Sequence, residues 1–163
     1  IGTFYHHVDK SQMKRFYDYL NVKLVILQFG GNTVPSIRDT AMARNYASYM
    51  RNQVAILRKL APEASILFIG PADMSVKDGT RYVTHPFVES VRDNLREAML
   101  DAGCAFFDVF DAMGGRNSMP VWVDERLAGR DYIHFSPKGA RKIGTLLYSA
   151  LINDYNNYLR ELP

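Results

Sequence analysis

An aspartate and a histidine stand three residues apart in the stretch DYIHFSPKGARKIG, directly before a segment that predicts a helix start. An imidazole in such a place can act as a general base when a carboxylate fixes its tautomer, and one tight turn can supply both groups. Asp131 and His134 are therefore candidate catalytic residues. The spacing alone leaves another interpretation open, in which His134 packs near the helix start and Asp131 is a solvated turn residue.

A second candidate group ends the apolar run VKLVILQFGGN, in which a strand-like segment stops at two glycines and an asparagine. Glycine lets a backbone approach a substrate closely, and an asparagine amide can donate a hydrogen bond to a developing oxyanion. Asn32 is therefore a candidate oxyanion donor. A plain tight turn explains the same residues, because glycine and asparagine both tolerate positive φ.

The segments around these residues predict helices that alternate with apolar strands. Strands are expected over residues 22–29, 65–69 and 104–109, and the first should be covered on both faces. Helices are expected over residues 9–20, 40–60 and 87–102 and from Ser136 onward, the last one burying Ala140, Ile143, Leu147, Ala150 and Leu151. Residues 70–86 predict a loop and residues 113–130 an irregular stretch, whose Trp122 could line a substrate site or cover the core.

Such alternation implies right-handed crossovers and a parallel sheet, in which ligands bind beyond the carboxyl ends of the strands. The loops that carry Asn32 and Asp73 and the segment that leads to His134 should therefore open on one edge. Gly2, 30 residues before Asn32, is expected in a loop on the same edge. Its backbone N–H could be a second oxyanion donor, although a plain turn glycine is the alternative.

Composition narrows the class of protein. The chain has 163 residues, enough for one domain with a core of its own, and Cys104 is expected to be a buried thiol. A net charge of +3 with scattered basic residues gives no case for a nucleic-acid partner. No apolar run approaches the roughly 20 residues that a membrane span needs. No cofactor pattern is present, and His6 and His7 lack further ligands at a metal-site spacing.

Gly2, LQFGGN and DYIHFSPKGA, taken together and in this order, resemble blocks two, three and five of the SGNH (GDSL-type) hydrolase family. The resemblance implies a flavodoxin-like three-layer α/β/α fold with a parallel sheet. It also implies ester hydrolysis by a Ser-His-Asp triad. By that resemblance His134 is the base, Asp131 orients it, and Gly2 and Asn32 are oxyanion donors. Thr33 follows Asn32 where many members carry an acidic residue.

Block one of the family, the Gly-Asp-Ser turn that carries the nucleophile, does not occur in this sequence. In the family it lies upstream of the block-two glycine, so the nucleophile is expected to precede Ile1. Residues 1–163 are accordingly predicted to be the C-terminal portion of a single hydrolase domain that lacks its N-terminal strand or strands. The missing segment would be the partner that completes the fold, and residues 1–163 alone should be inactive and poorly stable.

The expected function is that of a serine ester hydrolase acting on a small-molecule or polysaccharide ester, such as a carbohydrate O-acetylesterase or a short-chain acyl esterase. Resemblance to polysaccharide-acting members implies a secreted or periplasmic location. The alternative is a non-catalytic carbohydrate-binding module on the same fold. A nucleotide-binding flavodoxin-like protein is disfavoured, because no glycine-rich phosphate loop occurs.

Overall fold

A computed structural model describes residues 5 and 7–162, so Gly2 lies outside the described residues. The chain forms two compact units. The first comprises residues 1–72 and 86–108, and the second comprises residues 73–85 and 109–163. The prediction of a single domain stays a prediction.

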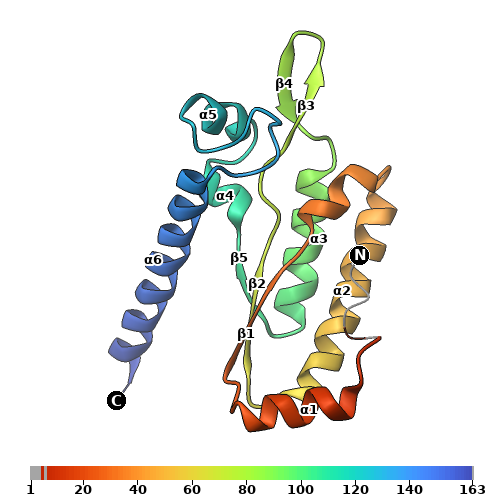
Figure 1. Cartoon of the computed structure of the whole chain (residues 1–163), viewed down its shortest axis with the longest axis vertical. Helices are drawn as coiled ribbons and strands as arrows, with labels where there is room; N and C mark the ends of the chain where they lie inside the picture. Colours follow the sequence, from red (N-terminus) through yellow and green to blue (C-terminus); the bar gives the residue numbers. More distant parts are fainter. Residues whose placement is uncertain (1–4, 6, 163) are drawn as a thin grey trace. The chain divides into compact units, whose positions relative to one another are not determined.

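A three-stranded parallel sheet forms the centre of the first unit. Its strands run in the order β1-β2-β5 and are β1 (Leu24–Gln28), β2 (Ser65–Ile69) and β5 (Ala105–Phe107). The helices of this unit are α1 (Lys10–Tyr19), α2 (Thr40–Leu60) and α3 (Val88–Asp101). Helices α2 and α3 pack against each other along the sheet, and α3 also contacts β5 (Figure 1). Helical crossovers between parallel strands confirm the predicted α/β class.

The core of the first unit lies between the sheet and these helices. Phe68 of β2 is fully buried, and its ring stacks on that of Phe106 with the centroids 6.0 Å apart. Helix α2 faces this core with Ala43, Ala47, Met50, Gln53, Val54, Leu57 and Leu60. Met42 is 39% exposed, because the smaller Ala43 occupies the packed position. Cys104 is buried, as predicted.

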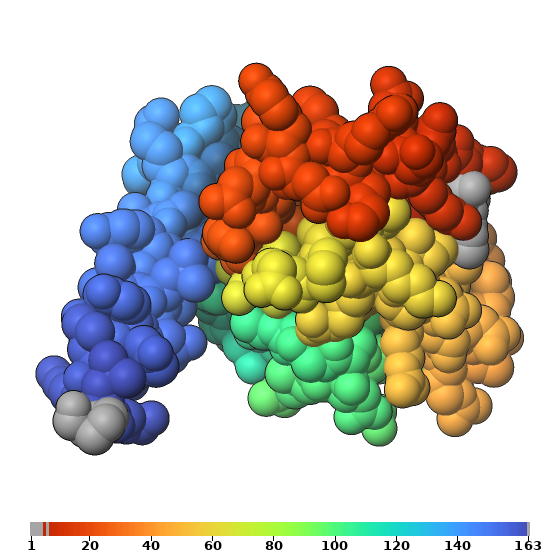
Figure 2. Space-filling view, turned by 90° about the horizontal axis from the view of Figure 1, so that it is seen from below, coloured from red at the N-terminus to blue at the C-terminus, as the bar shows by residue number. Residues whose placement is uncertain are grey.

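Strand β1 differs from the expectation of burial on both faces. Leu27 is only 7% exposed, whereas Leu24 and Ile26 are each 49% exposed. Alternate side chains of a strand point to opposite faces, so the structure covers one face of this edge strand and leaves the other partly open. Helix α1 lies beside the segment joining α2 to β2 (Figure 2). Phe16 of this helix and Leu20, which directly follows it, are likewise more than half exposed.

The second unit contains an antiparallel hairpin and three helices. The hairpin consists of β3 (Ser75–Asp78) and β4 (Arg81–Thr84), and the helices are α4 (Val109–Met113), α5 (Ser118–Asp124) and α6 (Pro137–Glu161). The prediction of an uninterrupted loop over residues 70–86 is wrong, because Gly79, with φ of +58°, turns the chain back on itself. The predicted irregular stretch contains α5. Its Trp122 is buried and donates its Nε1–H to the Met113 carbonyl over 2.9 Å, so it covers the core.

Helix α6 begins as predicted, because the Ser136 side chain accepts a hydrogen bond from the Gly139 N–H over 3.2 Å. Gly139 is buried against the backbone of Leu127, and a Cβ at this position would overlap the Leu127 carbonyl. The predicted burial of the later apolar residues is wrong for Ala140, which is exposed, and for Leu151, which is 41% exposed. Ile143, Leu147 and Ala150 are half-buried. Close contact is concentrated at the start of the helix, where the glycine permits it.

Candidate active site

Asp131 and His134 lie within one turn, in which two hydrogen bonds connect them and a third joins Asp131 to Ile133. The His134 Nδ1 and the Asp131 Oδ2 are 2.8 Å apart. The Asp131 Oδ1 accepts the backbone N–H groups of Ile133 over 3.0 Å and of His134 over 3.1 Å. An ionised carboxylate only accepts hydrogen bonds, so Nδ1 carries a proton, and in the neutral form of the ring Nε2 presents a lone pair. With 76% of its side chain exposed, His134 can offer that lone pair to another group.

The turn is fixed by backbone contacts on both of its sides. Tyr132 has a left-handed φ of +59°, and its N–H donates to the Gly129 carbonyl over 3.0 Å. The Gly129 N–H in turn donates to the His134 carbonyl over 2.8 Å. The Ser75 N–H of the hairpin donates to the Tyr132 carbonyl over 2.9 Å, and the Tyr82 ring stacks on the Tyr132 ring at 3.6 Å. The hairpin that sequence analysis missed therefore holds the turn in place.

The residues that follow the histidine join the turn to helix α6. The Ser136 N–H donates to the Leu127 carbonyl over 2.9 Å, and the Ser136 hydroxyl donates to the Arg126 carbonyl over 2.8 Å. Phe135 packs its ring against Trp122 with the centroids 5.4 Å apart. These contacts fix the entry angle of the helix, and with it the position of the preceding histidine.

Asp73 was expected near the site, but the structure gives it a structural role. Its carboxyl is fully buried and accepts the Met119 N–H over 2.8 Å and the Ser118 hydroxyl at 3.4 Å. Burial raises its pKa, and these hydrogen bonds partly offset the effect. Nearby, Thr84 and Asn117 are joined by two hydrogen bonds of 3.0 Å and 2.7 Å. Asp73 and this pair attach the hairpin to the start of α5.

The Asp131 carboxyl has a pKa lowered to about 2, chiefly by its hydrogen bond with the His134 ring and then by the two backbone N–H groups. The side chain is half exposed, so solvent screens these interactions and their contribution to stability is small. Because the folded-state pKa lies below the unfolded value of about 3.9, this contribution is complete above that value. It is lost as the pH falls through about 2.

We expect the Asp131 carboxyl to titrate near pH 2 in a ¹³C-detected NMR titration. In His134→Ala its midpoint should rise but remain below the ordinary aspartate value, because the Ile133 N–H and the backbone N–H of residue 134 still donate to it. An unchanged Asp131 midpoint in the variant would contradict the assigned hydrogen bond to the ring.

Asn32 lies in the first unit, in the 3₁₀ segment η1 (Gly31–Ser36) that directly follows β1. Gly30 begins this segment with φ of +111°, and a Cβ there would come within 2.9 Å of Leu95 and 3.3 Å of Pro71. Only glycine fits both the angle and the space. The Asn32 side chain is exposed, and its amide has no hydrogen-bond partner among the described residues. It is therefore free to donate to a bound group.

Tyr46 of α2 supports this loop. Its hydroxyl is hydrogen-bonded to the Thr33 side chain and to the backbone of Gly30, while burial of the ring raises its pKa. In the sequence, Tyr46 lies on the periodic stripe of helix 40–60, which predicts packing. The stripe does not predict the contact of its hydroxyl with Thr33 and Gly30. Thr33, the departure from the family pattern, thus has a structural partner in this protein.

The structure therefore brings Asp131 and His134 together and places Asn32 at the carboxyl end of β1, whereas Gly2 lies outside the described residues. Asn32 belongs to the first unit and the Asp131–His134 pair to the second, so their predicted common cleft stays a prediction.

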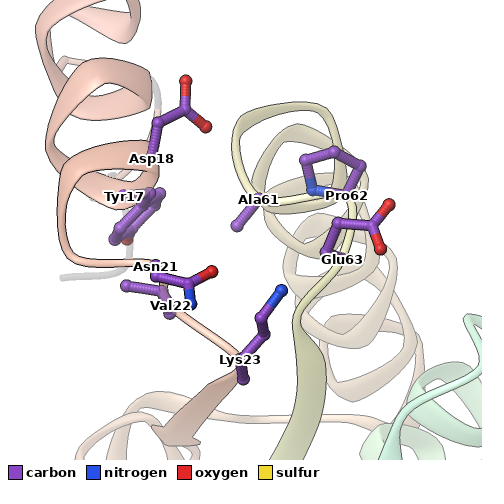
Figure 3. A pocket seen from close by; sticks show the side chains of 8 residues that line it. All are labelled: Tyr17, Asp18, Asn21, Val22, Lys23, Ala61, Pro62 and Glu63. Atoms are coloured by element: carbon purple, nitrogen blue, oxygen red, sulfur yellow. The ribbon is translucent and has the colours of Figure 1, made fainter.

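A small hollow of about 180 Å³ opens at the other end of the sheet in the first unit. Lys23 precedes β1 and Glu63 precedes β2, and both side chains line this hollow with residues from the end of α1 (Figure 3). It lies at the amino ends of these strands, away from Asn32. In the part of the chain that the structure describes, no group of three or more His, Cys, Asp or Glu side chains is arranged to hold a metal.

Fold and site together are those of an α/β protein with an Asp-His pair directly before its last helix. The model of the GDSL-like lipase/acylhydrolase family matches residues 6–142, and the chain belongs to this family. This match confirms the predicted family. No protein with a curated description matches the chain.

One similar solved structure is titled "Peptidoglycan O-acetylesterase in action, 5 min". It is 26% identical, with a TM-score of 0.79 over 90% of this chain and 41% of that chain. The similarity confirms the predicted SGNH hydrolase fold. The chain thus spans about two fifths of the length of that protein. None of the helices among residues 7–162 is long and apolar enough to cross a membrane.

Proposed function

We propose that this chain carries the base and part of the oxyanion hole of a serine ester hydrolase. The observation that carries the proposal is the hydrogen bond of 2.8 Å between Asp131 and the Nδ1 of an exposed His134. In this assignment His134 is the general base, Asp131 orients it, and Asn32 and Gly2 donate to the oxyanion. The nucleophile is a serine of the complete domain, because no serine of residues 1–163 follows a Gly-Asp pair.

The proposed reaction follows from the tautomer of His134, in which the proton is on Nδ1 and Nε2 can accept another. The His134 Nε2 takes the proton of the serine hydroxyl as its oxygen attacks the acyl carbonyl. The Asn32 amide stabilises the negative charge that develops on the carbonyl oxygen. His134 then returns the proton to the leaving alcohol, and the acyl-enzyme remains. A water molecule, deprotonated by the same imidazole, releases the carboxylic acid and regenerates the serine.

For the substrate we propose an acetyl or other short acyl ester of a carbohydrate. The similar structure, by its title, is a peptidoglycan O-acetylesterase, which supports an acetyl group and a glycan alcohol. A cell-wall polysaccharide lies outside the cytoplasmic membrane, so this substrate supports a secreted or periplasmic location.

The direct test uses the complete protein with its upstream segment. A serine-reactive fluorophosphonate should label it, and acetate should be released from O-acetylated glycans. Activity on p-nitrophenyl esters should fall as the acyl chain lengthens. Glycan binding without labelling or acetate release would instead establish the non-catalytic carbohydrate-binding alternative.

Asn32→Ala in the complete protein should lower kcat by about 10²–10³-fold, the effect of losing one oxyanion donor. KM should change little, because the donor acts mainly on charge that develops in the transition state. The melting temperature should also stay unchanged, since the amide has no partner in the described structure. Asn52→Ala, at an exposed asparagine of α2, is the matched control. A kcat within three-fold of wild type would remove Asn32 from the oxyanion hole.

A further inference from the structure

A large hollow opens in the second unit beside the Asp131–His134 turn. Its volume is about 850 Å³, within the range of roughly 300–1,000 Å³ of small-molecule sites. Arg130 and Tyr132, the two neighbours of Asp131 in the chain, both line it. The hollow is therefore lined in part by the turn that carries the proposed base, and it is large enough for a sugar unit.

The side chains that line the hollow carry more positive than negative charge. Arg126 and Arg130 line the hollow, and among the described residues Asp124 is the only acidic one that does so. Both arginines are exposed, and neither guanidinium has an ion-pair or hydrogen-bond partner among the residues described. Arg58, by contrast, donates to the Ala102 and Gly103 carbonyls.

The main chain at Arg126 is held in one conformation. Arg126 has a left-handed φ of +60°, and its carbonyl accepts the Ser136 hydroxyl over 2.8 Å. This fixes the direction in which its side chain leaves the main chain. The Tyr82 and Tyr132 rings, stacked with an angle of 6° between their planes, add an aromatic wall with two hydroxyl groups. Tyrosine presents a rigid apolar face together with a polar tip.

We propose that this hollow is a subsite for an anionic group, a carboxylate or a phosphate, carried by the acylated glycan next to the ester that is cleaved. Guanidinium groups match the geometry of both oxyanions with paired N–H donors. The proposal rests on the esterase function above, and it narrows the substrate class to acidic O-acylated glycans. Arg126 and Arg130 then determine specificity, and Tyr82 with Tyr132 contacts the sugar that bears the charge.

The test compares three O-acetylated glycans with the complete enzyme: one neutral, one with a uronic acid carboxylate and one with a phosphate. In Arg126→Gln/Arg130→Gln the ratio of kcat/KM for an acidic over the neutral glycan should fall about 10–100-fold, the effect of losing charge-assisted hydrogen bonds. The acidic glycan with the larger fall identifies the group bound. Arg141→Gln/Arg160→Gln, which removes the same charge from α6 outside the hollow, should leave the ratio unchanged.

Binding separates a failure of this inference from a failure of the proposed function. In the His134→Ala background, calorimetric affinity for the acidic glycans should fall about 10-fold or more in the Arg126→Gln/Arg130→Gln variant, whether or not any ester is hydrolysed. Equal loss in the Arg141→Gln/Arg160→Gln control would show a general charge effect and overturn the subsite. An unchanged acidic-to-neutral ratio and unchanged affinity would overturn it as well.

Discussion

His134→Ala in the complete enzyme is expected to lower ester turnover by about 10⁴–10⁶-fold, the loss that follows removal of a triad base. Without the imidazole nothing takes the proton from the serine hydroxyl or returns it to the leaving alcohol. The structure fits this role because the Nδ1 is engaged with Asp131 at 2.8 Å, which leaves the Nε2 for the substrate side. Turnover of p-nitrophenyl acetate measures the effect.

The expected loss of turnover in His134→Ala cannot be attributed to misfolding of the variant. The His134 side chain is 76% exposed, so its removal leaves no cavity and the melting temperature should be unchanged. His7→Ala, at another exposed histidine, should retain full activity. If His134→Ala hydrolyses the ester at a rate near that of wild type, the assignment of the base is wrong.

Asp131→Asn should lower kcat by about 10⁴-fold, as loss of the tautomer-fixing carboxylate does in a triad. The asparagine carbonyl can still accept the backbone N–H groups of Ile133 and His134, which now bind the Asp131 Oδ1. Its NH₂ group then faces the Nδ1 and donates to it. The imidazole proton is thereby forced onto the Nε2, where it blocks acceptance of the serine proton.

The tautomer is directly measurable. The ¹⁵N shifts of the His134 ring should show a protonated Nδ1 in the neutral ring of wild type and a protonated Nε2 in Asp131→Asn. Asp154→Asn, on the exposed surface of α6, is the control and should change neither the shifts nor kcat. A kcat of Asp131→Asn within ten-fold of wild type would show that Asp131 does not orient the base.

Local chemistry explains which elements the sequence predicted well. The predicted bounds of helix 40–60 and strand 65–69 agree with α2 (Thr40–Leu60) and β2 (Ser65–Ile69). A long periodic helix and a short apolar run before Gly70-Pro71 are strong local signals. The hairpin was missed because its strands have only four residues each. Strands this short carry almost no alternation to detect.

The candidate site also has one part that local sequence predicts and another part that it does not. The spacing of Asp131 and His134 predicts a single turn, and the hydrogen bonds inside that turn join residues two and three positions apart. The support from Ser75 and Tyr82 could not be predicted, because it comes from the hairpin in a distant part of the chain. The same holds for Tyr46, whose hydroxyl contacts the Gly30–Thr33 loop.

The amino-acid sequence alone predicts the alternation of helices and strands, the cap at Ser136, the glycine loop before Asn32 and the pairing of Asp131 with His134. Each depends on hydrogen bonds and dihedral preferences among residues close together in the chain. Which apolar residues are buried and which arginines line the hollow depends on tertiary contacts. Leu24 and Leu27 are alike as residues, yet they are 49% and 7% exposed. Their difference arises from which face of the strand the helices cover, and burial depends on such contacts between distant segments.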